Sequence, residues 1–287
     1  MKVKRQHYVP RFYLNYFADN KNQVWVYDKE IRKAFQTSII NIACEGYFYD
    51  DVNIDKVYDT DQYIEKYYAE IETETAPIYS ELISQLLDVN YTPQQEVKEN
   101  LSRFLVSQIE RTNRFREESY QFTLDMYKEF KEKGFTKEQL KQFGFEDENY
   151  DKKQVHLESI LAGIEMDDTL MEILSDHIWM FFKNETTQCF YTSDHPVVKK
   201  SNLNNDLISN DGYGSPGIEI AFPLTPKLIL LMFDREYFYE QSERDCHVLN
   251  MNSIENVDYY NSMQAAFSQR QIYSYSNKFE LINEMGL

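Results

Sequence analysis

Arg5-Gln6-His7-Tyr8-Val9-Pro10-Arg11-Phe12-Tyr13-Leu14 is the densest stretch of the chain, and the rest of the sequence can be arranged around it. It combines a histidine, an amide, two arginines, three aromatic side chains and a proline. Proline suits the first turn of a helix, and aromatic residues then recur at helical spacing, so residues 10–18 are predicted to form a short helix. His7 is expected just before the start of that helix, near its positive end.

The composition is that of a folded protein with an unusual share of aromatic residues. The 287 residues have room for one large core or two smaller ones, and 23 Tyr and 19 Phe against 8 Gly and 7 Pro indicate extensive packing. The formal net charge of -18 repels phosphate backbones, which disfavours nucleic-acid binding through a broad basic surface. A local basic pocket near Lys2, Lys4, Arg5 and Arg11 stays open; the alternative is a solvated basic segment.

Cysteine usage and apolar runs bear on the compartment and on metal binding. The 3 cysteines are far apart and outside any C-x-x-C spacing, which is typical of free thiols in a reducing cytoplasm. No apolar run approaches the roughly 20 residues of a membrane span, and the start lacks the apolar segment of a signal peptide. No histidine or cysteine spacing fits a metal site. We therefore expect a cytoplasmic protein with no membrane span, no metal and no cofactor.

Strand patterns occur towards both ends of the chain. Val24–Tyr27 and Lys33–Thr37 are predicted to form a hairpin, and Ile218–Phe222 and Leu228–Phe233 are predicted to pair across a turn. Gln271–Tyr275 is predicted to be a closing strand. Because the run Leu228–Phe233 is continuously apolar, we expect it to be a buried central strand.

The middle of the chain has the spacing of helices. Apolar residues recur at steps of three and four from Thr60, Pro77 is predicted to end or kink that helix, and Thr169–Lys183 is predicted to be another. Residues 131–168 are charged and poor in large aliphatic side chains, which predicts a helical insertion or lid. The fold class is therefore α+β in a single domain of residues 1–287. It has a predominantly helical middle and small antiparallel β elements at the N- and C-terminal ends, which are expected to meet in one sheet.

Two familiar catalytic patterns have little support. Gly212–Gly217 has the G-x-G-x-x-G spacing of a dinucleotide-binding turn, but a polar loop precedes it and a strand follows, so a surface loop is predicted. Ser193 is not on the strand-to-helix turn of a nucleophile elbow. The cysteines lie in apolar surroundings, where structural thiols are more common than reactive ones.

One set of polar residues is left as a candidate site. Gln108 and Arg111 are three residues apart and so share a helix face, and Gln108 interrupts an apolar stripe where its amide needs a partner. The β-rich run Gln188–Thr192 is predicted to be a strand, and Asp194 lies at its end, where folds often place functional residues. The roles assigned are catalytic for His7 and Asp194, and substrate-binding for Gln6, Arg11, Gln108, Arg111 and Ser193. The alternative is that this cluster pins the termini to the core.

Several of these residues carry a family resemblance. Gln6-His7 with Pro10 and Tyr13-Leu14 resembles the start of family 4238 of bacterial domains of unknown function, and Val24–Asp28 resembles its first strand. Gln108, Arg111 and Thr112 are similar to its Gln-x-x-Arg-Thr helix, with Asn113 where a proline is often found.

The resemblance extends to the C-terminal part. Tyr191–Val197 is similar to the family's Thr-Ser-Asp-x-Pro-Val segment, with His195 at the variable position, which argues against a catalytic role for His195. Phe222–Pro226 and the stretch from Asn261 to Tyr273 also match. The resemblance implies a bacterial or phage-borne cytoplasmic protein, and it implies no established activity.

Two functions from different classes follow from the candidate residues. The first is a metal-independent hydrolase or transferase acting on a phosphorylated, nucleotide or nucleic-acid-end substrate, with His7 as general acid or base. Arg11 and Arg111 would hold the anion, and Asp194 would orient His7 or an arginine. The second is a non-catalytic binding or regulatory module, a defence or toxin–antitoxin partner, whose acidic surface binds a basic protein. The sequence leaves open which of the two applies, and it leaves the oligomeric state open.

Overall fold

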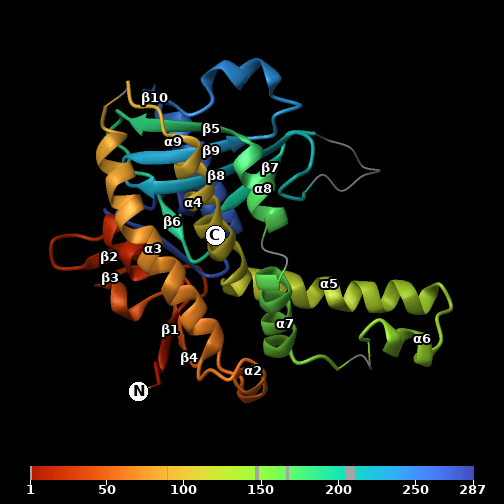
Figure 1. Cartoon of the computed structure of the whole chain (residues 1–287). Coiled ribbons are helices and arrows are strands. Elements are labelled where there is room, and N and C mark those ends of the chain that lie inside the picture. Colours follow the sequence, from red (N-terminus) through yellow and green to blue (C-terminus); the bar gives the residue numbers. More distant parts are fainter. Residues whose placement is uncertain (1, 89, 146–148, 166–167, 204–210) are drawn as a thin grey trace.

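The structure is a computed structural model that describes residues 2–88, 90–145, 149–165, 168–203 and 211–287 (Figure 1). It has the expected α+β class, with a helical middle and β-sheets built from both ends of the chain. No helix within these ranges combines the length and the apolar character needed to cross a membrane.

The N-terminal part is a set of short elements around a hairpin. The helix predicted for residues 10–18 is one α-helical turn followed by one 3-10 turn, and the predicted hairpin forms with Val26 opposite Phe35. The elements are β1 (Arg5–His7), α1 (Arg11–Leu14), η1 (Asn15–Phe17), β2 (Gln23–Asp28), β3 (Lys33–Ser38), η2 (Ile39–Asn41) and β4 (Cys44–Gly46).

Helices make up the middle of the chain. They are α2 (Val52–Val57), α3 (Tyr63–Gln85), α4 (Gln95–Glu110), α5 (Asn113–Glu132), α6 (Lys137–Gln142), α7 (Lys152–Glu165) and α8 (Asp168–Asp176). In Figure 1, α5 extends sideways away from the sheets, with α6 at its far end and α7 beside its inner part.

One helix boundary differs from the sequence expectation, and at Pro77 one of the two expected outcomes, the end of the helix, is wrong. Pro77 does not end α3, which continues to Gln85; Tyr79 and Leu82 after the proline are buried in the core, and this packing outweighs the lost backbone hydrogen bond. The helix predicted for Thr169–Lys183 stops at Asp176, and its second half is strand β5 (Ile178–Asn184). A short apolar run does not distinguish a buried helix from a buried strand.

The largest sheet in the described part of the chain has five strands, in the order β10-β5-β9-β8-β7. Its strands are antiparallel except for the parallel pair β10 and β5. As expected, β9 is central and buried along its whole length. The other strands are β7 (Val198–Ser201), β8 (Ile218–Thr225), β9 (Leu228–Phe233) and β10 (His247–Met251).

Both faces of this sheet are covered. Trp179 and Leu230 point into the large core shared with α3, α4 and the N-terminal elements. Met180 and Leu231, their neighbours in sequence, point to the other face, where Met263 of α9 (Ile254–Phe267) packs. This alternation is the period of two that defines a strand. The remaining C-terminal helices are η3 (Tyr239–Arg244) and α10 (Glu280–Glu284).

The two ends of the chain meet in a second sheet, as predicted. Its order is β3-β2-β11-β6, and all three pairings are antiparallel. Strand β11 (Gln271–Ser274) lies between β2 and the short β6 (Thr192–Ser193). A separate ribbon pairs β1 with β4, so that His7 lies opposite Cys44.

The expected insertion 131–168 contains α6 and α7, and these two helices differ in how they pack. Leu157 and Ile160 of α7 belong to the same core as Tyr13, near the N-terminus, and Tyr273, near the C-terminus. Outside that core, Phe130 stacks on Phe143 just after α6, with ring centroids 5.6 Å apart. The division of the chain into domains stays a prediction.

Candidate functional site

Arg111 lies at the junction of α4 and α5 and is 2 % exposed. Its Nη1 donates to Oε1 of Glu72 on α3 at 2.8 Å, and its Nη2 donates to the carbonyl oxygen of His7. Its guanidinium carbon lies 4.7 Å from the centre of the Tyr68 ring. Burial alone would lower the pKa of Arg111, but the Glu72 carboxylate reverses this and raises it, so the arginine stays charged.

Gln6 fixes the N-terminal strand next to this arginine. Its side-chain oxygen accepts the backbone N–H of Tyr49 at 2.7 Å, and its Nε2 donates to Asp50 at 2.5 Å. The hydroxyl of Tyr49 in turn donates to the carbonyl oxygen of Arg111 at 2.9 Å. Gln6 is fully buried and both ends of its amide are engaged within the protein.

His7 follows in the same strand and is half-buried. Burial lowers the pKa of His7 to about 4, and the positive charges of Arg11 and Arg111 act in the same direction. A hydrogen bond with the backbone of Ile39 acts against this shift. The imidazole is therefore neutral at pH 7, and its buried Nε2 has no hydrogen-bond partner within the described chain.

Other polar atoms without a hydrogen-bond partner lie close to Arg111. Oε2 of Glu65, Oη of Tyr68 and Nε of Arg111 itself are buried and unpartnered among the described residues. Burial raises the pKa of Glu65 to about 7, opposed by the charge of Arg111. Buried polar groups are normally hydrogen-bonded, so a concentration of exceptions marks a place of special chemistry or hydration. We call His7, Glu65, Tyr68, Glu72 and Arg111 the Arg111 cluster.

Gln108 lies one turn before Arg111 and is fully buried. Its Nε2 is 3.4 Å from the hydroxyl of Ser107, and its Oε1 has no partner in the described structure. The sequence predicted that this amide would need a partner, and its oxygen has none among the residues that the structure describes.

Arg11 is exposed and lines an open groove of about 600 Å3 between the N-terminal elements and α3. Its charged lining residues are Arg11 and Lys21. Ala76, on the α3 wall, is one helical turn after Glu72, which places the groove next to the Arg111 cluster. We call this the Arg11 groove. Its lining residues are Arg11, Phe12, Asn15, Tyr16, Lys21, Asn22, Ser38, Ile39, Ile40 and Ala76.

Asp194 and Ser193 hold the C-terminal strand in place. The Asp194 carboxylate accepts the backbone N–H groups of residues 269–271 at 2.8, 2.7 and 2.7 Å. Burial raises the pKa of Asp194 to about 6, against the effect of these three amides. Oγ of Ser193 lies 2.7 Å from Oε1 of Gln264 on α9. One edge of Asp194 borders a cavity of about 360 Å3 that also carries Glu30, Glu45 and Glu117.

The structure brings some of the predicted residues together and keeps others apart. His7 and Arg111 meet through a main-chain carbonyl, and Arg11 lies on the groove next to them. Among the described residues, no hydrogen bond or ion pair joins Asp194 to His7 or Arg111. The helix and strand segments do meet, but through Thr112 and His195, whose Oγ1 and Nδ1 are 2.9 Å apart. The functional roles of these residues stay predictions.

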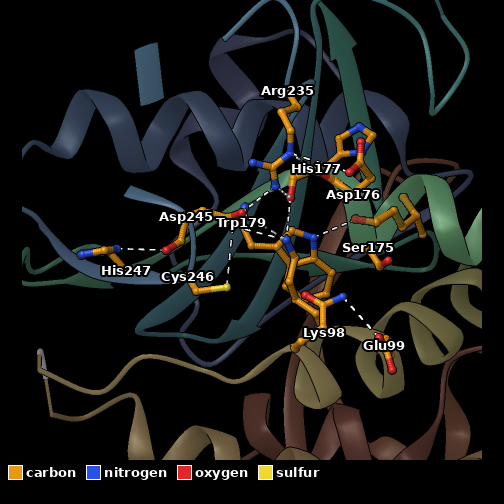
Figure 2. A network of polar contacts seen from close by, with 12 residues as sticks. Lys98, Glu99, Ser175, Asp176, His177, Trp179, Arg235, Asp245, Cys246 and His247 are labelled. Atoms are coloured by element: carbon orange, nitrogen blue, oxygen red, sulfur yellow. Dashed lines mark hydrogen bonds and ion pairs between the residues drawn. The ribbon is translucent and has the colours of Figure 1, made fainter. Parts of the chain in front are cut away.

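Figure 2 shows a second polar network, which the sequence did not indicate. Nζ of Lys98, on α4, donates to the carbonyl oxygen of His177 at 2.8 Å and lies 3.3 Å from Oδ1 of Asp245. The Asp245 carboxylate also accepts the backbone N–H of Trp179 at 2.9 Å and Nη2 of Arg235 at 2.6 Å. The donors Lys98, Arg235 and the Trp179 N–H all have acceptors in this network. We therefore interpret it as a structural link between α4, the start of β5 and the start of β10.

The chain matches one family over nearly its whole length. Residues 5–278 match the family described as "Protein of unknown function (DUF4238)". The chain belongs to this family. Comparison with curated proteins and comparison with solved structures each gave no match. Membership of DUF4238 therefore supports the resemblance found in the opening stretch and gives no activity.

In this DUF4238 chain, the α3 side of the Arg111 cluster was not predicted from the sequence. Glu65, Tyr68 and Glu72 follow steps of three and four, so they share one helix face. Carboxylates bordering an apolar stripe were a usable signal for a buried cation. Among the described residues, no group of three or more His, Cys, Asp or Glu side chains is arranged to hold a metal ion.

Proposed function

We propose that the chain binds a small phosphorylated substrate in the Arg11 groove and acts on it as a metal-independent hydrolase or transferase. The observation that carries the proposal is the charge of the groove. Arg11 and Lys21 are both positive, and no carboxylate is among the lining residues that the structure describes, in a chain with a formal net charge of -18. Such a site attracts a small anion locally, while the rest of the surface repels long polyanions.

His7 is the acid–base group of this proposal. Its imidazole interacts with the backbone of Ile39, which lines the groove, and it is neutral at pH 7 because its pKa is about 4. A phosphate held by Arg11 would offset one of the charges that lower this pKa and would raise it towards working pH. Binding of the substrate would in this way make His7 a stronger base.

The test combines a binding readout with a turnover readout. Phosphate mono- and diesters are offered to the protein in EDTA, and NMR follows the pKa of His7 with and without inorganic phosphate. We expect phosphate to raise that pKa by about one unit and turnover to fall at least about 100-fold in His7→Asn. Lys33→Gln, an exposed lysine at the far end of β3, is the matched control and should change neither. An unchanged pKa of His7 together with full turnover in His7→Asn would reject the proposal.

A second function is favoured by the saturation of two predicted site groups. Both terminal nitrogens of Arg111 are engaged, by Glu72 and by the carbonyl oxygen of His7, and Asp194 accepts three backbone amides. These contacts are internal to the protein, so both side chains act in holding the fold together. This supports a binding or regulatory module, such as a defence or toxin–antitoxin partner, in which these residues are structural. Capture of one stoichiometric basic partner that is unaffected by His7→Asn, with no turnover of any phosphate ester, would support this function over the first.

A further inference from the structure

The groove has the size of a small-molecule site and rigid walls. Its volume of about 600 Å3 lies inside the range of about 300–1,000 Å3 that is usual for ligand pockets. Residues 11, 12, 15 and 16 form one wall, residues 21–22 and 38–40 beside the hairpin form a second, and Ala76 of α3 contributes a third. All three belong to regular elements or to the turns that join them.

Two aromatic side chains line this groove, and the core fixes both of them. The ring of Tyr16 packs on Tyr79 with centroids 5.2 Å apart, and the ring of Phe12 meets Tyr79 edge-on at 5.8 Å and Phe104 at 5.3 Å. Phe12 and Tyr16 are half-buried, so part of each ring faces the groove. Rings held in this way lose little freedom when a flat ligand stacks on them.

Amides and a hydroxyl complete the lining. Asn15, Asn22 and Ser38 all border the groove, and the two asparagine side chains form no hydrogen bond to another described residue. The backbone of Asn22 is nevertheless fixed, because its N–H donates to Asp19 at 2.9 Å and its carbonyl accepts from Ile39 at 3.1 Å. An asparagine offers both donors and an acceptor, which suits the edge of a base or a sugar hydroxyl.

The charge of this groove sets it apart from two other hollows of the protein. The hollow between α3 and α4 carries Glu81 and Glu96, and the hollow beside Asp194 carries further carboxylates. Asp19 lies close to Lys21 but is occupied by the backbone N–H groups of Lys21 and Gln23, at 2.8 and 3.0 Å. Arg11 is therefore the stronger phosphate anchor of the pair, since it forms no ion pair with a described residue and its planar fork matches phosphate oxygens.

We infer that the Arg11 groove takes a single nucleotide, with the phosphate at Arg11 and Lys21 and the base against Tyr16 and Phe12. This rests on the proposed function and narrows its substrate class. The groove combines cations for the phosphate, fixed aromatic rings for the base, and amides without a hydrogen-bond partner among the described residues for a base edge or the sugar. The net charge of -18 argues for a mononucleotide over a long strand.

The experiment compares ligands that share parts of a nucleotide. Calorimetric titration uses inorganic phosphate, ribose 5-phosphate, adenosine, and adenosine and uridine 5′-monophosphate, at one fixed salt concentration. We expect a nucleoside monophosphate to bind at least about 10-fold more tightly than ribose 5-phosphate, because base stacking is worth about this much. Tyr16→Leu should remove that advantage and leave ribose 5-phosphate unaffected. Arg11→Gln should weaken every phosphorylated ligand about 10-fold or more, and Lys33→Gln none of them.

Each alternative outcome has a separate meaning. Equal affinity for ribose 5-phosphate and the nucleotides would overturn the nucleotide inference and leave the phosphorylated substrate in place. Binding of no phosphorylated ligand, or binding that is unaffected by Arg11→Gln, would overturn both. A 5′-phosphorylated oligonucleotide that binds much more tightly than the mononucleotides would overturn the single-nucleotide inference in favour of a strand end. Circular dichroism and the melting temperature of each variant show whether it is folded, so a loss of binding is attributed to the groove only in folded protein.

Discussion

Glu65 shows how one buried carboxylate is expected to affect the stability of the protein. Burial raises its pKa to about 7, against an ordinary value of about 4.3 in an unfolded chain. The folded state therefore holds the Glu65 proton over a pH range in which the unfolded state has lost it. Its stability contribution is fully present at low pH, falls as the pH rises from about 4 to about 7, and is lost above pH 7.

Glu65→Gln should remove this pH-dependent penalty. We expect the variant to have a free energy of unfolding about 1–3 kcal/mol higher than the original protein at pH 8, since Gln carries no charge to desolvate. At pH 5 most of the difference should be gone. Urea unfolding at the two pH values measures this, with Glu70→Gln on the exposed face of α3 as control. An equal effect of Glu65→Gln at both pH values would show that the ionised carboxylate is not destabilised in the folded state.

Among the secondary-structure elements, the strands predicted correctly are those whose own residues show a clear apolar pattern beside a turn. The β2–β3 and β8–β9 hairpins were predicted correctly because alternating or continuous apolar runs flank a turn, and pairing of this kind is local. The helix predicted for Thr169–Lys183 was wrong in its second half, which is strand β5, because a short apolar run is compatible with a helix or a strand. Only pairing with β9 and β10, which come much later in the chain, decides that it is a strand.

The same contrast between local patterns and long-range contacts applies to the candidate site. His7 and Arg111 were grouped in the sequence as polar residues that no other motif explained, and the structure joins them through the carbonyl oxygen of His7. The partner that Arg111 uses, Glu72, is 39 residues away on another helix, and no local pattern selects it from the other carboxylates of an acidic chain. Lys98 and Asp245 are 147 residues apart, so the network in Figure 2 was beyond the sequence for the same reason.

The Lys98 network is expected to stabilise the contact between α4 and the central sheet. The side chain of Lys98 is 4 % exposed and that of Asp245 is 24 % exposed. Lys98→Met keeps most of the apolar stem but leaves the Asp245 carboxylate and the His177 carbonyl with one donor fewer. We expect this to lower the free energy of unfolding by about 1–3 kcal/mol, because two acceptors lose a charged donor while Asp245 keeps Arg235 and the Trp179 N–H.

The matched control is Lys133→Met, which breaks the pair of Lys133 with Glu129, whose side chains are 59 % and 53 % exposed. An exposed pair of this kind contributes about 0.5 kcal/mol or less. Both variants are compared by urea unfolding at neutral pH. If Lys98→Met were as mild as the control, the network would be a consequence of the packing and not one of its causes.

In the whole molecule, strands from the N-terminal and C-terminal parts of the chain pair in one sheet, and the fold depends on this pairing. Strand β11 lies between β2 from the N-terminal hairpin and β6 from the middle of the C-terminal half. The residues just before and at the start of β11 supply the three amides that satisfy the buried Asp194 carboxylate. Helix α10 is more peripheral, and its main buried contribution is Ile282, in a small cluster with Phe279.

Two C-terminal truncations separate these contributions. A chain ending at Arg270 lacks β11, so β2 and β6 lose their shared neighbour and Asp194 loses the donor of residue 271. We expect no cooperative unfolding transition for this chain. A chain ending at Lys278 keeps β11 and loses Phe279 and α10, which should cost about 3–5 kcal/mol but leave a single transition. Circular dichroism during heating and urea unfolding distinguishes the two. A cooperative transition in the shorter chain would mean that the N-terminal hairpin and the five-stranded sheet fold without β11.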